Sequence, residues 1–302
     1  MMRQFAKPAV RRGGEVTRAQ RAQQCALLSA LAALAGLPLA AWAATGGQVA
    51  ERIRADVAGG RPVVAHVVVA LCDNLHQGIV PVPKGIGNGQ DPRSNLYWGA
   101  GYGVRSYFSR QAGYSLRHLP VSGQVLDRIV LTRDLPGSGR PIKLVVVAEA
   151  WDGSAIAAAI SRFLRLAAGY DAETIASPAA GQAAIAAGGD AAIVAYVGHN
   201  GLMDFAAPVR PEARRGAPPR SSIVLACASQ RYFSDLIRSG GSHPLLLTTG
   251  LMAPEAYSLE EALHTFAAGG SPQEARRAAA AVYDRVQRCG LAGALRLFAS
   301  EP

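Results

Sequence analysis

The chain has 302 residues, of which 50% are hydrophobic and 17% charged, and its formal net charge is +10. This composition is typical of a globular protein with a large core and excludes a low-complexity or disordered chain. The basic residues beyond the first forty or so are scattered, without a basic helix face or interleaved aromatic residues, so we do not expect a nucleic acid as a partner.

Residues 1–43 have the succession of zones that defines a secretory signal peptide. Six basic residues precede an apolar run at 25–40, and that run ends in Ala41-Trp42-Ala43. The run is shorter than the roughly 20 residues that a membrane-spanning helix needs. We therefore predict cleavage after Ala43 and a periplasmic or secreted protein with no membrane span. Cleavage removes six basic residues and one acidic residue, which lowers the net charge from +10 to about +5.

Apolar runs and helical patterns alternate along the rest of the chain. Strands are predicted at 63–71, 142–148, 191–197, 222–226 and 244–248. Helices are predicted at 154–168, 178–187, 229–238, 258–268 and 272–288, with Ser258 and Glu261 as a capping box. Such alternation predicts an α/β three-layer sandwich, in which a doubly wound, mainly parallel sheet has helices on both faces. We expect residues 44–302 to form one such domain.

Two segments interrupt this alternation. Residues 72–110 are rich in glycine and proline and form a loop far longer than an ordinary strand-to-helix connection, which is typical of a functional loop. Its second half, from residue 95 to 108, has aromatic residues at helical spacing and predicts a short packed helix. Asp73 and Asn74 follow the first strand and are candidates for binding substrate or orienting a catalytic group, with the capping of a turn as the alternative. Residues 212–220 are interpreted as an exposed linker.

The third and fourth predicted strands each end in a residue that is used in nucleophilic catalysis. The third strand runs into Gly198-His199-Asn200-Gly201, and the fourth runs into Ala226-Cys227. Residues 193–197 and 223–226 are continuous apolar runs, as expected for strands that are buried on both faces of a parallel sheet. Because sites in open α/β sheets form at the carboxyl ends of the strands, His199 and Cys227 are expected to share one crevice.

This pair has the residue types that cysteine-dependent acyl transfer requires. A thiol needs a base to take its proton and donors to hold the oxyanion, and His199 is the predicted base and later the general acid. A helix predicted from Ser229 begins just after Cys227, and a helix N-terminus stabilises a thiolate. Asn200 and the N–H groups near Gly201 are candidates for the oxyanion hole. No cysteine or histidine spacing fits a zinc site, and we expect no metal or cofactor.

A strand that ends in His-(Asn)-Gly, followed 28 residues later by a strand that ends in Ala-Cys, resembles the caspase-like (clan CD) cysteine peptidases, which include caspases, legumains, gingipains and separases. The resemblance implies a sheet of caspase-like topology, with the catalytic histidine after the third core strand and the cysteine after the fourth. It implies His199 as general base, Cys227 as nucleophile, and a peptide or protein substrate. The family usually has glycine directly after the histidine, whereas Asn200 intervenes here.

Other interpretations remain open. One is an inactive peptidase-like domain with a binding or structural role in the cell envelope. Another is an amidase with a nucleophile elbow, in which His243 or His264 would have to act, although neither is expected at the carboxyl end of a strand. Asp204 is interpreted as a solvated loop residue, and His76, His118, His243 and His264 as surface or packing residues. A disulfide between Cys72 and Cys289 would leave Cys227 free. The sequence specifies no oligomeric state.

Overall fold

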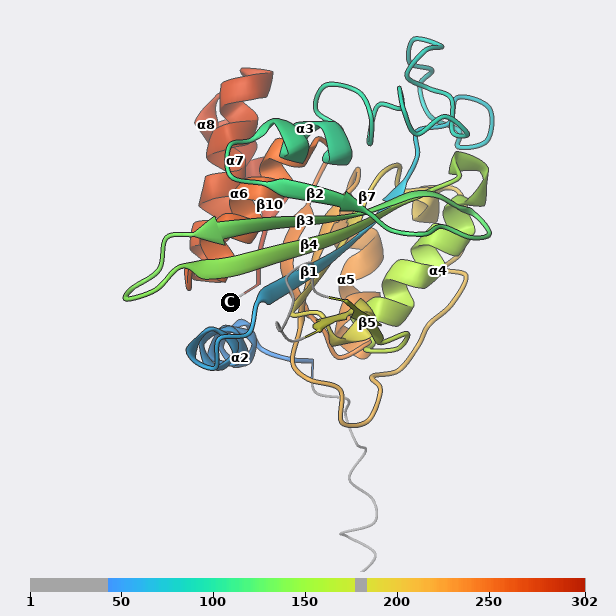
Figure 1. Ribbon diagram of the computed structural model, residues 1–302. Helices are drawn as coiled ribbons and strands as arrows, with labels where there is room; N and C mark the ends of the chain where they lie inside the picture. The colour runs from blue at the N-terminus through green and yellow to red at the C-terminus, as the bar shows by residue number, and fades with distance from the viewer. Residues whose placement is uncertain (1–42, 177–183, 302) are drawn as a thin grey trace, which may run out of the picture. The chain divides into compact units, whose positions relative to one another are not determined.

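The computed structural model describes residues 43–176 and 184–301 (Figure 1). These residues form an α/β fold, in which helices flank a mixed, mainly parallel sheet of eight strands. Contacts within the chain group residues 41–302 into one compact unit. Residues 1–42 of the predicted signal peptide lie outside the described residues. Cleavage after Ala43 therefore stays a prediction.

The main sheet has the strand order β10-β9-β8-β7-β1-β4-β3-β2, and a separate two-stranded sheet pairs β5 with β6. The bounds of the strands are β1 Val63–Ala70, β2 Ser115–His118, β3 Val125–Leu135, β4 Ile142–Trp151, β5 Glu173–Ile175, β6 Ile185–Ala187, β7 Ile193–Val197, β8 Ser221–Leu225, β9 His243–Thr248 and β10 Phe298–Ala299.

The five predicted strands are confirmed as β1, β4, β7, β8 and β9, and they form the parallel part of the sheet. All residues of β1, β7, β8 and β9 are buried, because helices cover both faces of the sheet. This burial explains why the strands have continuous apolar sequences rather than alternating ones. Their carboxyl ends all meet at one edge of the sheet, which is hereafter the carboxyl edge.

Three antiparallel pairings extend this parallel core. β3 pairs with β4, β2 pairs with β3, and β10 pairs with β9 at the opposite side of the sheet. β2 and β3 are only partly buried, and their sequences mix apolar and charged residues. They were not predicted because their sequences lack the uninterrupted apolar run of a buried strand.

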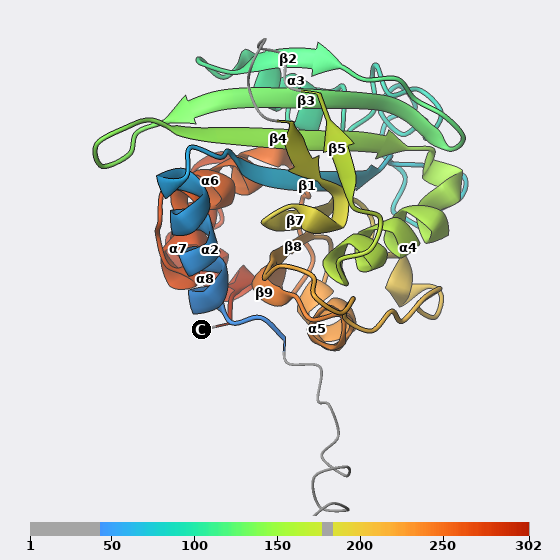
Figure 2. The ribbon, with the colours of Figure 1, turned by 60° about the horizontal axis from the view of Figure 1, so that its bottom comes forward.

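The helices lie on both sides of the sheet, as Figure 2 shows. One face packs against α2, α3, α6 and α7, and the other against α4, α5 and the β5–β6 sheet. The bounds are α2 Gly46–Ala58, α3 Val104–Arg110, α4 Ile156–Ala167, α5 Ser229–Ser239, α6 Ala256–Ala267, α7 Pro272–Gln287 and α8 Leu291–Leu297, with short 3₁₀ turns η1 Gly153–Ala155, η2 Gly188–Asp190 and η3 Gly201–Met203.

Several local predictions were wrong. Residues 185–187 of the predicted helix at 178–187 form strand β6, and residues 177–183 lie outside the described residues. Helix α6 begins at Ala256, so Ser258 lies buried inside it rather than at its cap. A capping box does occur in another helix, α2, where Thr45 and Gln48 form it.

The supposed linker at 212–220 is not simply exposed, because its last residue is one of the largest buried side chains. Arg220 donates hydrogen bonds to the carbonyls of Ala167 and Pro218, and burial lowers the pKa of its guanidinium to about 10, with Arg52 and Arg214 nearby contributing. Ala167 is the last residue of α4, where carbonyl groups carry the negative end of the helix dipole. Arg220 therefore anchors the segment to that helix end.

The long loop lies where it was predicted, after β1. The helix that was predicted at 95–108 is shorter and begins at Val104. Residues 71–103 run through turns above the carboxyl edge, drawn in teal at the upper right of Figure 1, and α3 follows at Val104–Arg110. Asn95 fixes the loop to the end of β1, because its side chain accepts from the N–H and donates to the carbonyl of Cys72. No helix within the described ranges combines the length and apolar character that crossing a membrane requires.

Candidate functional site at the carboxyl edge

His199 and Cys227 lie just beyond the ends of two neighbouring parallel strands. β7 and β8 pair as far as Val197 and Leu225, and the N–H of Gly198 donates to the carbonyl of Leu225 at 3.2 Å. The side-chain amide of Asn200 then donates to the carbonyl of Cys227 at 2.6 Å. The two segments that carry the predicted dyad are therefore joined directly at the carboxyl edge.

Gly198 allows the chain to turn tightly before His199. It adopts a φ of 152°, and a Cβ atom at this position would lie 2.9 Å from the carbonyl oxygen of Ala70 at the end of β1. A side chain here would push apart the ends of β1 and β7. Glycine at this position therefore keeps the His199 segment close to the loop that follows β1.

The imidazole of His199 is paired with Asp204, whose carboxylate oxygen lies 2.6 Å from Nε2. The side chain of His199 is 13% exposed and that of Asp204 is 47% exposed. The hydroxyl of Tyr196 donates to the carbonyl of His199 at 2.8 Å, which further fixes the turn. Asp204 is a half-exposed loop residue, as expected, and it also pairs with the predicted base. Its five-residue spacing from His199 was the only signal for this role in the sequence.

Cys227 is partly exposed, and its sulfur faces the main chain of Met252. The Met252 N–H lies 3.5 Å from Sγ, and the Met252 carbonyl oxygen lies 3.7 Å from it. Met252 belongs to the segment that follows β9, so a third strand end contributes to the surroundings of the thiol. The N–H of Met252 thus donates to the sulfur of Cys227 from the segment that follows β9.

The residue after Cys227 has an unusual backbone conformation. Ala228 adopts φ 49° and ψ 33°, which is the left-handed region, and its N–H donates to the carbonyl of Gly250 at 2.8 Å. A non-glycine residue in this region is strained and persists only where its surroundings hold it. Here it forms the sharp turn from β8 into helix α5, which begins at Ser229 as predicted.

Two buried hydroxyl groups hold this turn in place. Ser229 and Thr248 exchange hydrogen bonds between their main-chain N–H groups and hydroxyl oxygens, at 3.1 Å and 2.9 Å. The hydroxyl of Ser229 also donates to the carbonyl of Val224 at 2.9 Å, and that of Thr248 donates to the carbonyl of Ala226. These residues were missed from the sequence because their partnership spans two strands. They position Cys227 without touching its side chain.

The oxyanion candidates have partners within the chain. The side-chain oxygen of Asn200 accepts from the N–H of Leu202 at 3.1 Å, so this side chain caps the turn η3 while its amide holds Cys227. The N–H of Gly201 donates to the carbonyl of His199 at 3.1 Å. Asn200 thus links the two strand ends, and the main-chain N–H of Met252 is the one that donates to the sulfur.

Asp73 and Asn74 contact other residues of the long loop rather than His199. Asp73 is 1% exposed, pairs with His76 at 2.9 Å and caps the turn at Leu75. These hydrogen bonds, with that of Gln90, hold the pKa of Asp73 below its usual range despite burial. Asn74 bonds both main-chain groups of Val82. Both residues line a pocket of about 360 Å³ within the loop, together with Leu75, Lys84, Gly87, Asn88 and Gln90.

Three histidines outside the site, His76, His118 and His264, have side-chain partners that the sequence did not indicate. His76 pairs with Asp73, and His118 lies 3.0 Å from Asp127. His264 accepts or donates a 2.8 Å hydrogen bond with the hydroxyl of Tyr114 and lies 3.7 Å from Glu260, four residues earlier in α6. His243 and His264 both lie away from the carboxyl end of any described strand, which gives no support to the amidase interpretation.

The three cysteines within the described residues have free thiols. Cys72 is buried, which raises its pKa to about 11, and it hydrogen bonds with Tyr97, whereas Cys289 is exposed. The structure contains no disulfide between Cys72 and Cys289, so the conditional prediction of that pairing does not apply to it. Cys227 is free, as a nucleophile must be.

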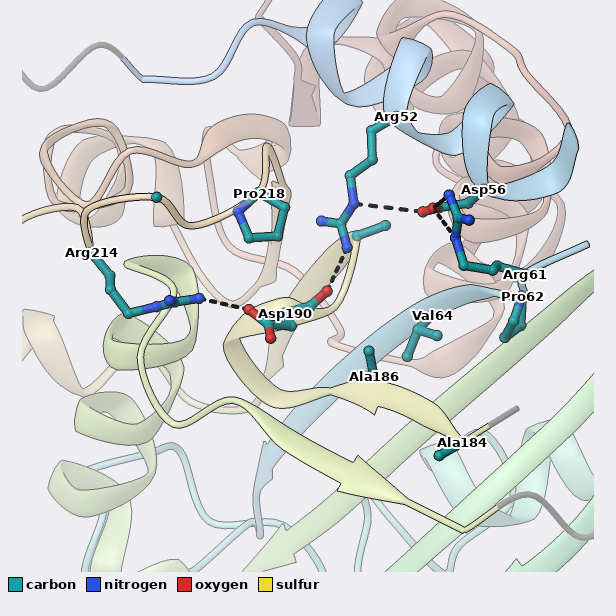
Figure 3. Close-up of a pocket in the computed structure, with 12 residues that line it drawn as sticks. Arg52, Asp56, Arg61, Pro62, Val64, Ala184, Ala186, Asp190, Arg214 and Pro218 are labelled. Carbon is teal, nitrogen blue, oxygen red and sulfur yellow. Dashed lines mark hydrogen bonds and ion pairs between the residues drawn. The ribbon is translucent and has the colours of Figure 1, made fainter. Parts of the chain in front are cut away.

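A pocket of about 540 Å³ lies at the opposite edge of the sheet and is shown in Figure 3. Its charged side chains are Arg52, Asp56, Arg61, Asp190 and Arg214. Arg52 lies 3.6 Å from Asp56 and donates to the carbonyls of Asp190, Ala191 and Pro219, at 2.5, 3.2 and 2.7 Å. These contacts tie helix α2 to the segments that precede β7 and β8, so they serve the fold.

Comparisons with family models, curated proteins and solved structures found no match for this chain. Within the two described ranges, no group of three or more histidine, cysteine, aspartate or glutamate side chains is placed to hold a metal ion. The interpretation of the site therefore depends on the geometry of the carboxyl edge.

Proposed function

We propose that this protein is an exported, cysteine-dependent hydrolase, a caspase-like peptidase with His199 as base and Cys227 as nucleophile. The observation that carries the proposal is the junction of the two strand ends, where Asn200 bonds the carbonyl of Cys227 and Asp204 orients His199. A free, partly exposed thiol and a carboxylate-paired imidazole on two joined strand ends are the groups that acyl transfer to sulfur requires.

The topology of the sheet supports this proposal. If the parallel strands are numbered along the chain, their order in the sheet is 2-1-3-4-5, with His199 after the third and Cys227 after the fourth. Helices on both faces of this sheet are consistent with a doubly wound, three-layer sandwich of caspase-like topology. These are the positions that the resemblance assigns to the catalytic residues of that superfamily.

The proposed reaction proceeds in two stages. His199 takes the thiol proton, the sulfur of Cys227 bonds to the peptide carbonyl carbon, and the C–N bond breaks as His199 returns the proton to the leaving amine. Water then attacks the thioester with His199 again as base, releasing the carboxylic acid and restoring the thiol. The Met252 N–H next to the sulfur is positioned to stabilise negative charge there.

One observation favours the alternative, a peptidase-like domain that only binds. Nε2 of His199 faces Asp204, and the sulfur of Cys227 faces Met252, so both groups have partners within the chain. Such a domain would use the same carboxyl edge and its long loop to hold a partner in the cell envelope. Its cysteine would react no faster than an ordinary thiol.

The rate of iodoacetamide labelling separates the two functions. We expect Cys227 to be labelled near neutral pH faster than the exposed Cys289, and His199→Ala to slow the labelling of Cys227 about a hundredfold. Cys289, measured by mass spectrometry in the same sample, serves as the internal control. Labelling of Cys227 that is slower than that of Cys289, and equal in both proteins, would favour the binding domain.

A further inference from the structure

The most exposed large apolar side chains gather at the carboxyl edge. Val80, Leu75 and Leu251 are 88%, 84% and 78% exposed, and they lie in the segments that follow β1 and β9. Met203, in the turn after β7, is 44% exposed. Single exposed apolar residues are ordinary, but several around one site indicate a surface that binds an apolar partner.

Leu251 lies on the cysteine side of the site. It directly precedes Met252, whose main-chain N–H and carbonyl both contact the sulfur of Cys227. Its position is therefore within one residue of the groups that surround the thiol. A side chain from a bound molecule that reaches Cys227 would pass this leucine.

Leu75, Val80 and Met203 lie on the histidine side. Met203 directly precedes Asp204, which pairs with His199 at 2.6 Å. Gly78, between Leu75 and Val80, lies against the same carboxylate, because a Cβ atom added to it would be 3.8 Å from Asp204. The long loop and the turn η3 thus meet beside the imidazole, and both present apolar side chains to solvent.

We propose that these residues form apolar subsites, and that the substrate is an extended peptide with bulky apolar side chains next to the bond that Cys227 attacks. This inference rests on the proposed function. Asp204 is paired with His199 and Asp73 with His76, so neither carboxylate is free to bind a basic side chain, whereas Leu75, Val80 and Leu251 are strongly exposed. An extended peptide suits this arrangement because its successive side chains point to opposite sides.

The proposal is tested by measuring the binding of three fluorescein-labelled hexapeptides whose termini are blocked and uncharged. This measurement does not depend on cleavage of the peptides. The peptides differ only at two central positions, which carry Leu-Leu, Lys-Lys or Asp-Asp. We expect the leucine peptide to bind the full chain at least about tenfold more tightly than the other two. Equal binding of the three peptides, or preference for a charged one, would overturn the proposal.

Variants locate the binding. Leu251→Ser and Val80→Ser should each weaken binding of the leucine peptide severalfold, while Leu291→Ser, a matched change at a 49% exposed leucine in α8, should leave it unchanged. Equal effects of all three substitutions, or none, would contradict the assignment of subsites.

A second measurement separates this inference from the proposed function. Peptidyl chloromethyl ketones with Leu or Lys next to the reactive carbon alkylate a catalytic thiol, as chloride leaves and a C–S bond forms. We expect Cys227 to react with the leucyl probe at least about tenfold faster than with the lysyl probe, and iodoacetamide labelling to be the same in Leu291→Ser and the wild type. Rapid iodoacetamide labelling without a leucyl preference would reject the subsites alone. Slow labelling with retained leucine-peptide binding would reject the peptidase alone.

Discussion

The two edges of the sheet hold their polar side chains in different ways. At the edge with the large pocket, the guanidinium of Arg52 binds three carbonyl oxygens, and Arg214 pairs with Asp190 at 2.7 Å (Figure 3). At the carboxyl edge, the sulfur of Cys227 has long contacts to the main chain of Met252, and the carboxylate that pairs with His199 is half exposed. The comparison indicates that the large pocket is a structural junction, whereas the loosely held groups are those available for chemistry.

The largest expected effect tests the structural side of this comparison. Arg52→Ala removes the donor to three carbonyls in a part of the fold where its side chain is 17% exposed. We expect the free energy of unfolding to fall by about 3 kcal/mol, because hydrogen bonds from a charged donor are worth roughly 1.5–3 kcal/mol each and water replaces part of them. Denaturant unfolding measures the change.

Arg61→Ala is the matched control, since Arg61 lines the same pocket but its side chain is 59% exposed. Its ion pair with Asp56 should contribute less than about 1 kcal/mol. If the two substitutions cost the same stability, Arg52 does not have the structural role assigned to it.

Glu260 tests whether a buried, paired side chain always stabilises the fold. It pairs with Arg133, yet burying its charged carboxylate costs stability. It lies 3.2 Å from Arg133, but burial raises its pKa to about 7. A carboxyl whose pKa is higher in the folded protein than in the unfolded chain makes stability fall as pH rises, here between about 4.5 and 7. We expect Glu260→Gln to match the wild type near pH 5 and to be about 2 kcal/mol more stable at pH 8.

Thermal unfolding of both proteins across this pH range measures the difference. Burial also lowers the pKa of neighbouring His264 to about 4, but His264 is present in both proteins, so its contribution largely cancels. A Glu260→Gln protein that is less stable than the wild type at pH 8 would mean that the pair with Arg133 outweighs the cost of burial.

Asp204→Asn sharpens the chemical side of the comparison. The substitution keeps the shape of the side chain but removes the charge that faces Nε2 of His199. We expect His199-dependent alkylation of Cys227 to slow about tenfold, a modest loss for an orienting carboxylate because water reaches this one. Asp235→Asn, at a side chain that is 96% exposed in α5, is the control.

Recovery of the rate in Asp204→Glu would support an orienting role through charge. Unchanged rates in both Asp204 variants would show that the ion pair with His199 has no part in the reactivity of the thiol.

The smallest expected effect concerns backbone strain next to the thiol. Ala228→Gly and Arg288→Gly both relieve a left-handed non-glycine residue, with φ 49° and 53°, and each should change stability by less than about 1 kcal/mol. Only the first lies beside Cys227, so only Ala228→Gly should alter the alkylation rate. Similar alkylation rates in both variants and the wild type would mean that the strained turn does not position the sulfur.

The sequence predicted the parallel core because strands that are buried on both faces have uninterrupted apolar runs, as in β1 and β7. It also predicted the placement of His199 and Cys227, since parallel strands of similar length end at one edge. Strands β2 and β3 escaped prediction because they are half exposed and carry charged residues.

The supporting residues of the site could not be predicted in the same way. The hydroxyl pair of Ser229 and Thr248 connects positions 19 residues apart, and Met252 reaches Cys227 from the segment after β9. Such contacts depend on how distant segments pack, and no local pattern of residues encodes them. Helix α2 differs, because its capping box of Thr45 and Gln48 is a local pattern that the sequence itself contains.

The central strand also has a consequence for how the chain folds. β1 emerges early during synthesis, but its partners in β4 and β7 lie about 80 and 130 residues further along. Until both arrive, an eight-residue segment with His66 as its sole polar side chain stays unpaired, and such segments associate readily with other chains. The fold of the central sheet therefore depends on contacts between distant segments, and we expect it to form slowly.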